Sequence, residues 1–150
     1  MGRVLGGAAA IVHEVAEERR SVILHCSDGW DRTAQLCALS ELCLDPYYRT
    51  ALGFKVLVQK EWQGFGHKFR ERVWGHKVKE RSPIFFQFLD AVHQLIRKHP
   101  TAFEFTEQVL LRLLDALYSN AYSVRAPHHS FFITPDSWYC DIFRVGVLHL

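Results

Sequence analysis

Apolar residues recur at helical spacing in five stretches of the chain, and each stretch predicts an amphipathic helix. The expected helices cover residues 4–19, 32–44, 53–62, 82–99 and 106–120. Asp45 and Pro46 end the second helix, because proline cannot continue one. Ser82 followed by Pro83 is a typical helix start, and Thr106 can cap the last helix. The pattern therefore predicts a mostly helical chain.

Residues 21–25 carry the one convincing strand pattern. The run Ser-Val-Ile-Leu-His is short, apolar and rich in β-branched side chains, which is typical of a strand buried on both faces of a mainly parallel sheet. A polar loop follows at residues 27–31, and the next helix begins at Arg32. We therefore expect an α/β fold in which one buried strand leads through a tight loop into a helix.

Composition limits the chain to one globular core. Its 150 residues are 49% hydrophobic and 23% charged. Residues 121–150 differ from the rest, because their apolar clusters are interrupted by Pro127 and Pro135 and follow no sustained period. We therefore divide the chain into a partial domain at residues 1–120 and a tail at residues 121–150, to which we assign no function.

Charge and cysteine spacing narrow the function classes. A formal charge of +2 and a pI near 8.4 lack the large basic excess of a typical nucleic-acid-binding domain. The four cysteines match no zinc template, so we expect neither a metal nor a cofactor, and reduced thiols favour a cytoplasmic protein. The apolar run at residues 4–12 is followed too soon by Glu14, Glu17 and Glu18 to span a membrane.

Cys26 stands between the expected strand and the polar loop, a position that suits a phosphate-binding nucleophile. The backbone N–H groups of such a loop point inward and the following helix adds partial positive charge, so the site favours a thiolate and a bound phosphate. Arg32, six positions later, can grip two phosphate oxygens through its planar guanidinium. A bare Cys-x5-Arg pattern also fits a cysteine that packs as a small buried hydrophobe, but the expected strand, loop and helix favour the nucleophile.

The remaining loop residues have complementary chemistry. Asp31 can donate a proton to a leaving alcohol and later activate water, and Asp28 is the competing candidate. Gly29 permits a tight turn, Trp30 can form a wall of the site, and the Ser27 hydroxyl can hydrogen-bond within the loop. The residues expected to surround the phosphate are consecutive: Ser27, Asp28, Gly29, Trp30, Asp31 and Arg32. They predict an enzyme that cleaves phosphate esters through a covalent intermediate.

The string HCSDGWDRT at residues 25–33 resembles the signature of the myotubularin family of phosphoinositide 3-phosphatases, which are similar to protein tyrosine phosphatases. The likeness continues through LDPYYRT at 44–50, GF-x-VLV-x-KEW at 53–62, FGHKF at 65–69, RSPIF at 81–85 and PTAFEF at 100–105. It covers roughly residues 4–120 and implies a partial cysteine-phosphatase domain.

The resemblance also implies a mechanism and a substrate class. Cys26 is then the nucleophile that forms a phosphocysteine, Arg32 the phosphate clamp and Asp31 the general acid. The implied substrates are phosphatidylinositol 3-phosphate and the 3,5-bisphosphate. Lys68 and Arg72 match basic residues that contact other headgroup phosphates, and their spacing of four places both on one helix face.

Members of this family carry an N-terminal lipid-binding domain and a longer catalytic domain, so the chain is similar to the C-terminal part of the catalytic domain. The strand at residues 21–25 then lacks most of its sheet. Two alternatives stay open beside an active lipid phosphatase. One is a non-catalytic module that binds phosphoinositide or pairs with a full-length relative through exposed apolar faces. The other is a protein tyrosine phosphatase, which the acidic loop and the basic residues at 68 and 72 disfavour.

The resemblance finally implies partners and a location. We expect phosphoinositide headgroups at membrane surfaces, a homo- or heterodimer with family members, and no nucleic acid. The expected location is the cytoplasm, with peripheral association to membranes. His25 and His67 flank the expected site, and the sequence gives neither a role.

Overall fold

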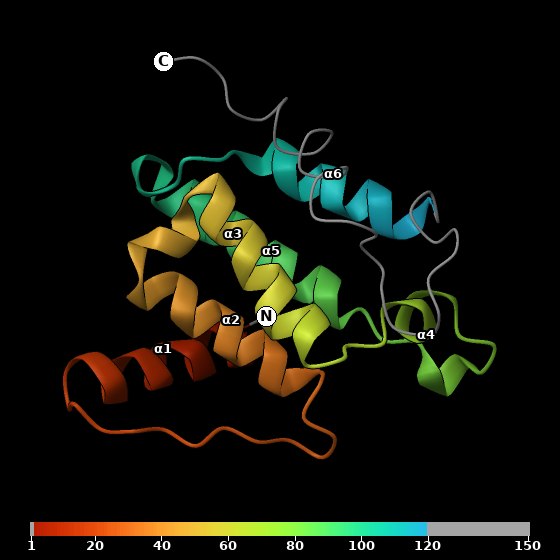
Figure 1. Ribbon diagram of the computed structural model, residues 1–150, viewed down its shortest axis with the longest axis horizontal. Helices are drawn as coiled ribbons and strands as arrows, with labels where there is room; N and C mark the ends of the chain where they lie inside the picture. Colours follow the sequence, from red (N-terminus) through yellow and green to blue (C-terminus); the bar gives the residue numbers. More distant parts are fainter. Residues whose placement is uncertain (1, 120–150) are drawn as a thin grey trace.

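Helices make up most of residues 2–119, the part of the chain that the computed structural model describes. Their bounds are α1 (Gly2–Ala16), α2 (Arg32–Leu44), α3 (Ala51–Val58), α4 (Phe69–Trp74), α5 (Ile84–Lys98) and α6 (Glu107–Tyr118), with a π-helical turn η2 (Gln59–Gly64) and 3₁₀ turns η1 (Pro46–Arg49), η3 (Val78–Glu80) and η4 (Pro100–Ala102). Figure 1 shows them stacked: α1 packs on α2, α2 on α3 and α5, and α5 on α6, while α4 lies at the edge.

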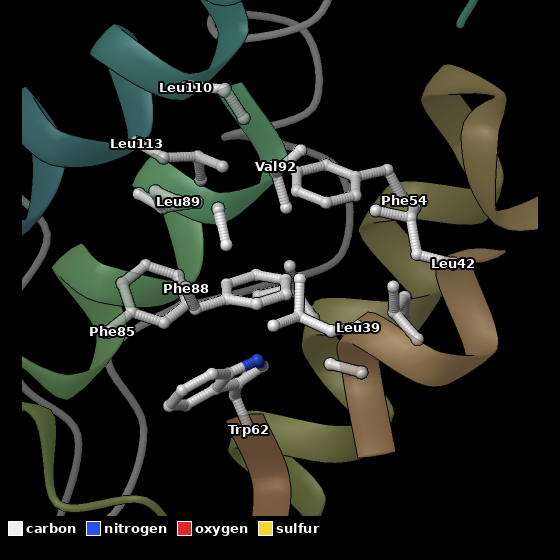
Figure 2. Packing of buried hydrophobic residues seen from close by; sticks show 14 of the residues in the cluster. Leu39, Leu42, Phe54, Trp62, Phe85, Phe88, Leu89, Val92, Leu110 and Leu113 are labelled. Atoms are coloured by element: carbon white, nitrogen blue, oxygen red, sulfur yellow. The ribbon is translucent and has the colours of Figure 1, made fainter. Parts of the chain in front are cut away.

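The core lies between α2, α3, η2, α5 and α6. Figure 2 shows the side chains that fill it: Leu39, Leu42, Phe54, Trp62, Phe85, Phe88, Leu89, Val92, Leu110 and Leu113. Trp62 is fully buried, and its ring centroid lies 4.9 Å from that of Phe85 and 5.1 Å from that of Phe88. Aromatic pairs at such distances add to the stability that comes from burying their surface. The core therefore links the helix that follows the cysteine loop to the remaining helices.

The five expected helices are present, with differences at their ends. The third passes from α3 into the π-helical turn η2, so the expected helix at residues 53–62 changes its winding part-way. The fourth begins at Ile84 and has Pro83 as its N-cap residue, one position later than expected. Thr106 precedes α6 as expected, but its side chain makes no capping hydrogen bond. Hydrophobic periodicity thus located the helices, and the tertiary contacts set their bounds.

The buried strand expected at residues 21–25 is wrong. The described residues contain no strand, and this segment has no regular secondary structure. Ile23 is 93% exposed and Val22 is 38% exposed, so the apolar run covers no core. A strand needs neighbours that pair with its backbone N–H and C=O groups, and residues 2–119 supply none. The expected tail at residues 121–150 lies outside the described residues.

None of the helices in the described part of the chain is long and apolar enough to cross a membrane.

Candidate active site

The loop that joins residues 21–25 to α2 wraps around the Cys26 sulfur. The backbone N–H of Gly29 donates a hydrogen bond to Cys26 Sγ at 3.2 Å. Gly29 has a φ of +84°, a conformation that side chains rarely adopt, although a Cβ there would meet no atom within 4 Å. The glycine is therefore needed for the conformation of the turn, as expected, and the turn aims a backbone donor at the thiol.

The loop makes the Cys26 thiol acidic. Partial burial raises the pKa of this thiol, but the nearby Thr33 hydroxyl and backbone N–H groups of the loop stabilise the thiolate, outweigh the effect and lower the pKa from 9.0 to about 6. The other described cysteines behave in the opposite way: burial raises the pKa of Cys37 to about 11 and also raises that of Cys43. At neutral pH Cys26 is therefore mostly a thiolate, the form that attacks phosphorus.

This acidity predicts a selective reaction. Alkylation of the chain by iodoacetamide is expected to label Cys26 with a rate that rises through a midpoint near pH 6, measured by mass spectrometry of the labelled peptide. Thr33→Val is expected to raise that midpoint by about one pH unit, because it removes a hydroxyl that stabilises the thiolate. In the Cys26→Ser variant, any label that remains lies on another residue, so this variant is the control for non-specific labelling. A midpoint near pH 9 for the unaltered chain would contradict the proposed acidity.

Arg32 turns back toward the start of the loop. Its Nη2 donates a hydrogen bond to Ser27 Oγ at 3.2 Å, and that hydroxyl in turn donates to Asp28 Oδ2 at 3.2 Å. All three side chains are exposed, so they are accessible to a ligand. The structure thus brings the Arg32 side chain back over the loop, while its role as a phosphate clamp stays a prediction.

Asp31 is held more firmly than Asp28. It is the N-cap residue of α2, yet its carboxylate makes no capping hydrogen bond. Instead Oδ2 lies 2.6 Å from Arg72 Nη2, and Oδ1 accepts a longer hydrogen bond of 3.4 Å from Arg72 Nε. The Asp31 side chain is 14% exposed and the Arg72 side chain 18%. This ion pair fixes a carboxylate next to the loop in a partly desolvated place.

Trp30 joins the loop to the two basic residues that the sequence singled out. Arg72 Cζ lies 4.5 Å and Lys68 Nζ 5.1 Å from the centroid of the Trp30 ring, which are cation–π distances. Lys68 is the residue before α4, so the two share one side of Trp30 without sharing one helix. Arg72 also donates from Nη1 to the Glu80 carbonyl oxygen at 2.6 Å. Lys68 is therefore the more available of the two for a ligand phosphate.

His67 also belongs to the site, although no sequence pattern assigned it a role. Its Nδ1 lies 3.0 Å from the carbonyl oxygen of Trp30 and 3.0 Å from Asp31 Oδ1. Burial lowers the pKa of His67, which keeps the ring neutral, and because both partners accept hydrogen bonds, Nδ1 carries the proton. The ring packs edge-on against Trp62 and Phe69, at centroid distances of 4.8 and 4.6 Å. His67 thus braces the loop from the core side, while His25 is exposed.

Comparison with known families agrees with this geometry. The family described as "Myotubularin-like phosphatase domain" matches residues 1–124. The chain belongs to the myotubularin-like phosphatase family. All the candidate residues of this myotubularin-like chain, from Cys26 to Arg72, lie within the matched residues. The resemblance seen in the sequence is therefore confirmed.

Individual myotubularin relatives are similar over the same region. "Myotubularin" of Xenopus laevis is 57% identical over 121 residues, and "Phosphatidylinositol-3,5-bisphosphate 3-phosphatase MTMR2" of Gallus gallus is 56% identical over 121 residues. "Phosphatidylinositol-3,5-bisphosphate 3-phosphatase mtm-1" of Caenorhabditis elegans is 52% identical over 124 residues. These alignments cover 77–79% of this chain but only 20–21% of the relatives. The chain thus spans about a fifth of the length of the curated relatives that it matches.

The arrangement supplies the groups that covalent phosphate transfer needs. A thiolate, a guanidinium and a carboxylate come from seven consecutive positions, Cys26 to Arg32, and two further cations lie beside Trp30. Among the described residues no group of three His, Cys, Asp or Glu side chains is placed to hold a metal ion. The myotubularin-like loop thus presents an acidic thiol, a guanidinium and a carboxylate within seven positions.

Proposed function

We propose that this chain carries the catalytic loop of a cysteine-dependent phosphoinositide 3-phosphatase. Its expected substrates are phosphatidylinositol 3-phosphate and phosphatidylinositol 3,5-bisphosphate, and the reaction passes through a phosphocysteine. The acidic thiol of Cys26 is the observation that carries the proposal, because packing in an apolar core would raise the pKa of a cysteine and not lower it. The chicken and nematode relatives, named as phosphatidylinositol-3,5-bisphosphate 3-phosphatases, support the substrate class.

The reaction has two steps. The Cys26 thiolate attacks the phosphorus, the bond between phosphorus and the inositol oxygen breaks, and Asp31 in its protonated form gives its proton to that oxygen. Asp31, now a carboxylate, then takes a proton from water as the water attacks the phosphocysteine. Inorganic phosphate leaves and the thiolate returns. Arg32 holds the equatorial oxygens in both steps through paired N–H donors.

The basic residues near Trp30 suit the rest of the headgroup. Lys68 and Arg72 place positive charge beside the loop, where a second phosphate of an inositol ring can bind. Trp30 supports both cations and forms one wall of the site. We therefore expect action at a membrane surface, because the substrate is part of a bilayer, and the cytoplasmic location stays a prediction.

A non-catalytic role is the second candidate, and one observation favours it. Ile23 is almost fully exposed in the segment that precedes Cys26, so this segment is free to pair with another polypeptide. The chain would then bind phosphoinositide, or pair with a full-length relative, without turning over substrate.

Phosphate release distinguishes the two. The full chain is incubated with vesicles that contain a 3-phosphorylated inositol lipid and, separately, with a phosphotyrosine peptide, beside the Cys26→Ser variant. We expect release from the lipid, little from the peptide, and none above background from the variant. Lipid binding with no release above the Cys26→Ser variant would support the non-catalytic role, and preferential release from the peptide would indicate a protein tyrosine phosphatase.

A further inference from the structure

A second charged surface lies next to the cysteine loop. Residues 68–81 contain six basic side chains and two acidic ones, a net formal charge of +4, whereas the whole chain carries +2. The segment starts at Lys68, whose Nζ lies 5.1 Å from the centroid of the Trp30 ring. Positive charge is therefore concentrated beside the proposed active site, while the rest of the chain is slightly acidic.

Residues 74–81, here called the 74–81 loop, run from the last residue of α4 through the 3₁₀ turn η3 to Arg81. The N–H of Ser82 donates to the carbonyl oxygen of Arg72 at 3.0 Å, which closes the loop at its base. Arg81 Nε donates to the carbonyl oxygen of Gly75 at 2.8 Å and ties the two ends of the loop together. Gly75 is needed there, because a Cβ would lie 2.4 Å from the carbonyl oxygen of Glu71. These contacts fix the loop in one shape.

The 74–81 loop exposes both apolar and basic side chains to solvent. Trp74 is 51% exposed and Val78 is 80% exposed. Lys77 and Lys79 flank Val78, and both are exposed. Lys77 makes an exposed ion pair of 3.6 Å with Glu80, but such pairs contribute little and do not hide the charge. A folded loop gains nothing for its own stability by presenting tryptophan and valine to water.

We propose that the 74–81 loop docks the chain onto an anionic lipid bilayer. Tryptophan is favoured at the boundary between lipid headgroups and acyl chains, valine adds apolar surface, and lysines beside them are attracted to anionic headgroups. A protein partner with an acidic, apolar groove is a different occupant, but exposed valine between two exposed lysines fits the boundary of an anionic bilayer better, because both the charge and the apolar side chain find a partner there. This inference rests on the proposed function, since docking matters because it brings the cysteine loop to a lipid substrate.

The test uses the full chain and vesicles of phosphatidylcholine, with and without phosphatidylserine and always without phosphoinositide. Omitting the substrate lipid removes any contribution from the active site. We expect co-sedimentation with the phosphatidylserine vesicles only, and weaker binding at high salt, since exposed charges are screened. Lys77→Glu with Lys79→Glu is expected to weaken binding by at least about 25-fold, because each basic group near an anionic surface changes binding roughly fivefold. Separately, Trp74→Ala with Val78→Ser is expected to weaken binding about tenfold, because it removes the apolar surface that enters the bilayer boundary.

Matched controls separate docking from general effects. Leu52→Ala removes an apolar side chain that is also 51% exposed, and Lys98→Glu with Arg112→Glu reverses two exposed basic residues on other helices. Both controls are expected to bind like the unaltered chain, and circular dichroism checks that every variant is folded. Three results would overturn the proposal. They are a lack of binding that depends on phosphatidylserine, an equal loss of binding in the control variants, and binding to an immobilised acidic peptide in place of vesicles.

Failure of docking can be told from failure of the proposed function. Turnover of a water-soluble, short-chain 3-phosphorylated inositol lipid is expected to be the same for the loop variants and the unaltered chain, because the loop does not touch the reacting atoms. Turnover of the long-chain lipid in vesicles is expected to fall with binding. A chain that binds vesicles but releases no phosphate retains the docking surface and loses the catalytic proposal.

Discussion

Asp31→Asn is expected to lower kcat for release of phosphate from the inositol lipid by about 10²–10⁴-fold, the usual contribution of a positioned acid or base. The ion pair of 2.6 Å with Arg72 and the contact of 3.0 Å with His67 hold this carboxylate in one place beside the loop. Asparagine keeps the shape of the side chain but can neither give the leaving oxygen a proton nor take one from water. Steady-state assays of phosphate release measure the effect.

Asp28→Asn is the matched control for this prediction. The Asp28 carboxylate is exposed and accepts only the Ser27 hydroxyl among the contacts seen in the loop, so nothing fixes it toward a leaving group. We expect a loss of less than about tenfold. An aryl phosphate with a good leaving group needs no proton in the first step, so the burst of phosphoenzyme formation from it is expected to survive Asp31→Asn. A large loss in Asp28→Asn with a small one in Asp31→Asn would transfer the role to Asp28.

Thermal unfolding separates catalysis from structure in these variants. Asp31→Asn also leaves the partly buried Arg72 without its charged partner, which destabilises the chain to some degree. Equal melting temperatures with unequal kcat therefore assign the loss to proton transfer. A variant that is unfolded at the assay temperature would be replaced by Asp31→Glu, which keeps the charge and moves the carboxylate by one methylene.

Those parts of the site that are contiguous in sequence were predictable. The turn at Gly29, the return of Arg32 and the helix behind the loop are local consequences of residue type and spacing. The brace from His67 was not, because His67 and Trp30 are 37 positions apart and no local pattern marks the contact. Glycine at 66, with a φ of +76°, is the one local sign that the chain turns sharply before this histidine.

The helices and the strand show where periodicity succeeds and where it fails. A helix satisfies its own backbone hydrogen bonds, so an apolar stripe such as that of α5 is enough to predict it. A strand depends on neighbours far away in sequence, and the apolar run at residues 21–25 has none among the described residues. The residue pattern shows that this run is suited to a buried strand, but no other strand of the described chain pairs with it or covers it.

Trp62→Ala is expected to lower the free energy of unfolding by about 3–5 kcal/mol, the usual cost of removing a large buried aromatic side chain. The ring is 0% exposed and lies among Phe85, Phe88 and His67, so its loss opens a cavity between the core and the brace of the site. No hydrogen bond is lost with it, because the indole Nε1 has no partner among the described residues. The loss is a large part of the roughly 5–15 kcal/mol of a typical domain.

Trp74→Ala is the matched control, since it removes the same side chain from a place where it is 51% exposed. Urea unfolding followed by circular dichroism is expected to show a change of less than about 0.5 kcal/mol for Trp74→Ala. The fall in melting temperature for Trp62→Ala is expected to be roughly 10–20 °C. Because Trp62 supports the His67 ring, its loss also frees the loop at Trp30 and Asp31, so phosphate release should fall even at temperatures where the variant is folded. Equal stabilities of the two variants would show that the site does not rest on this core.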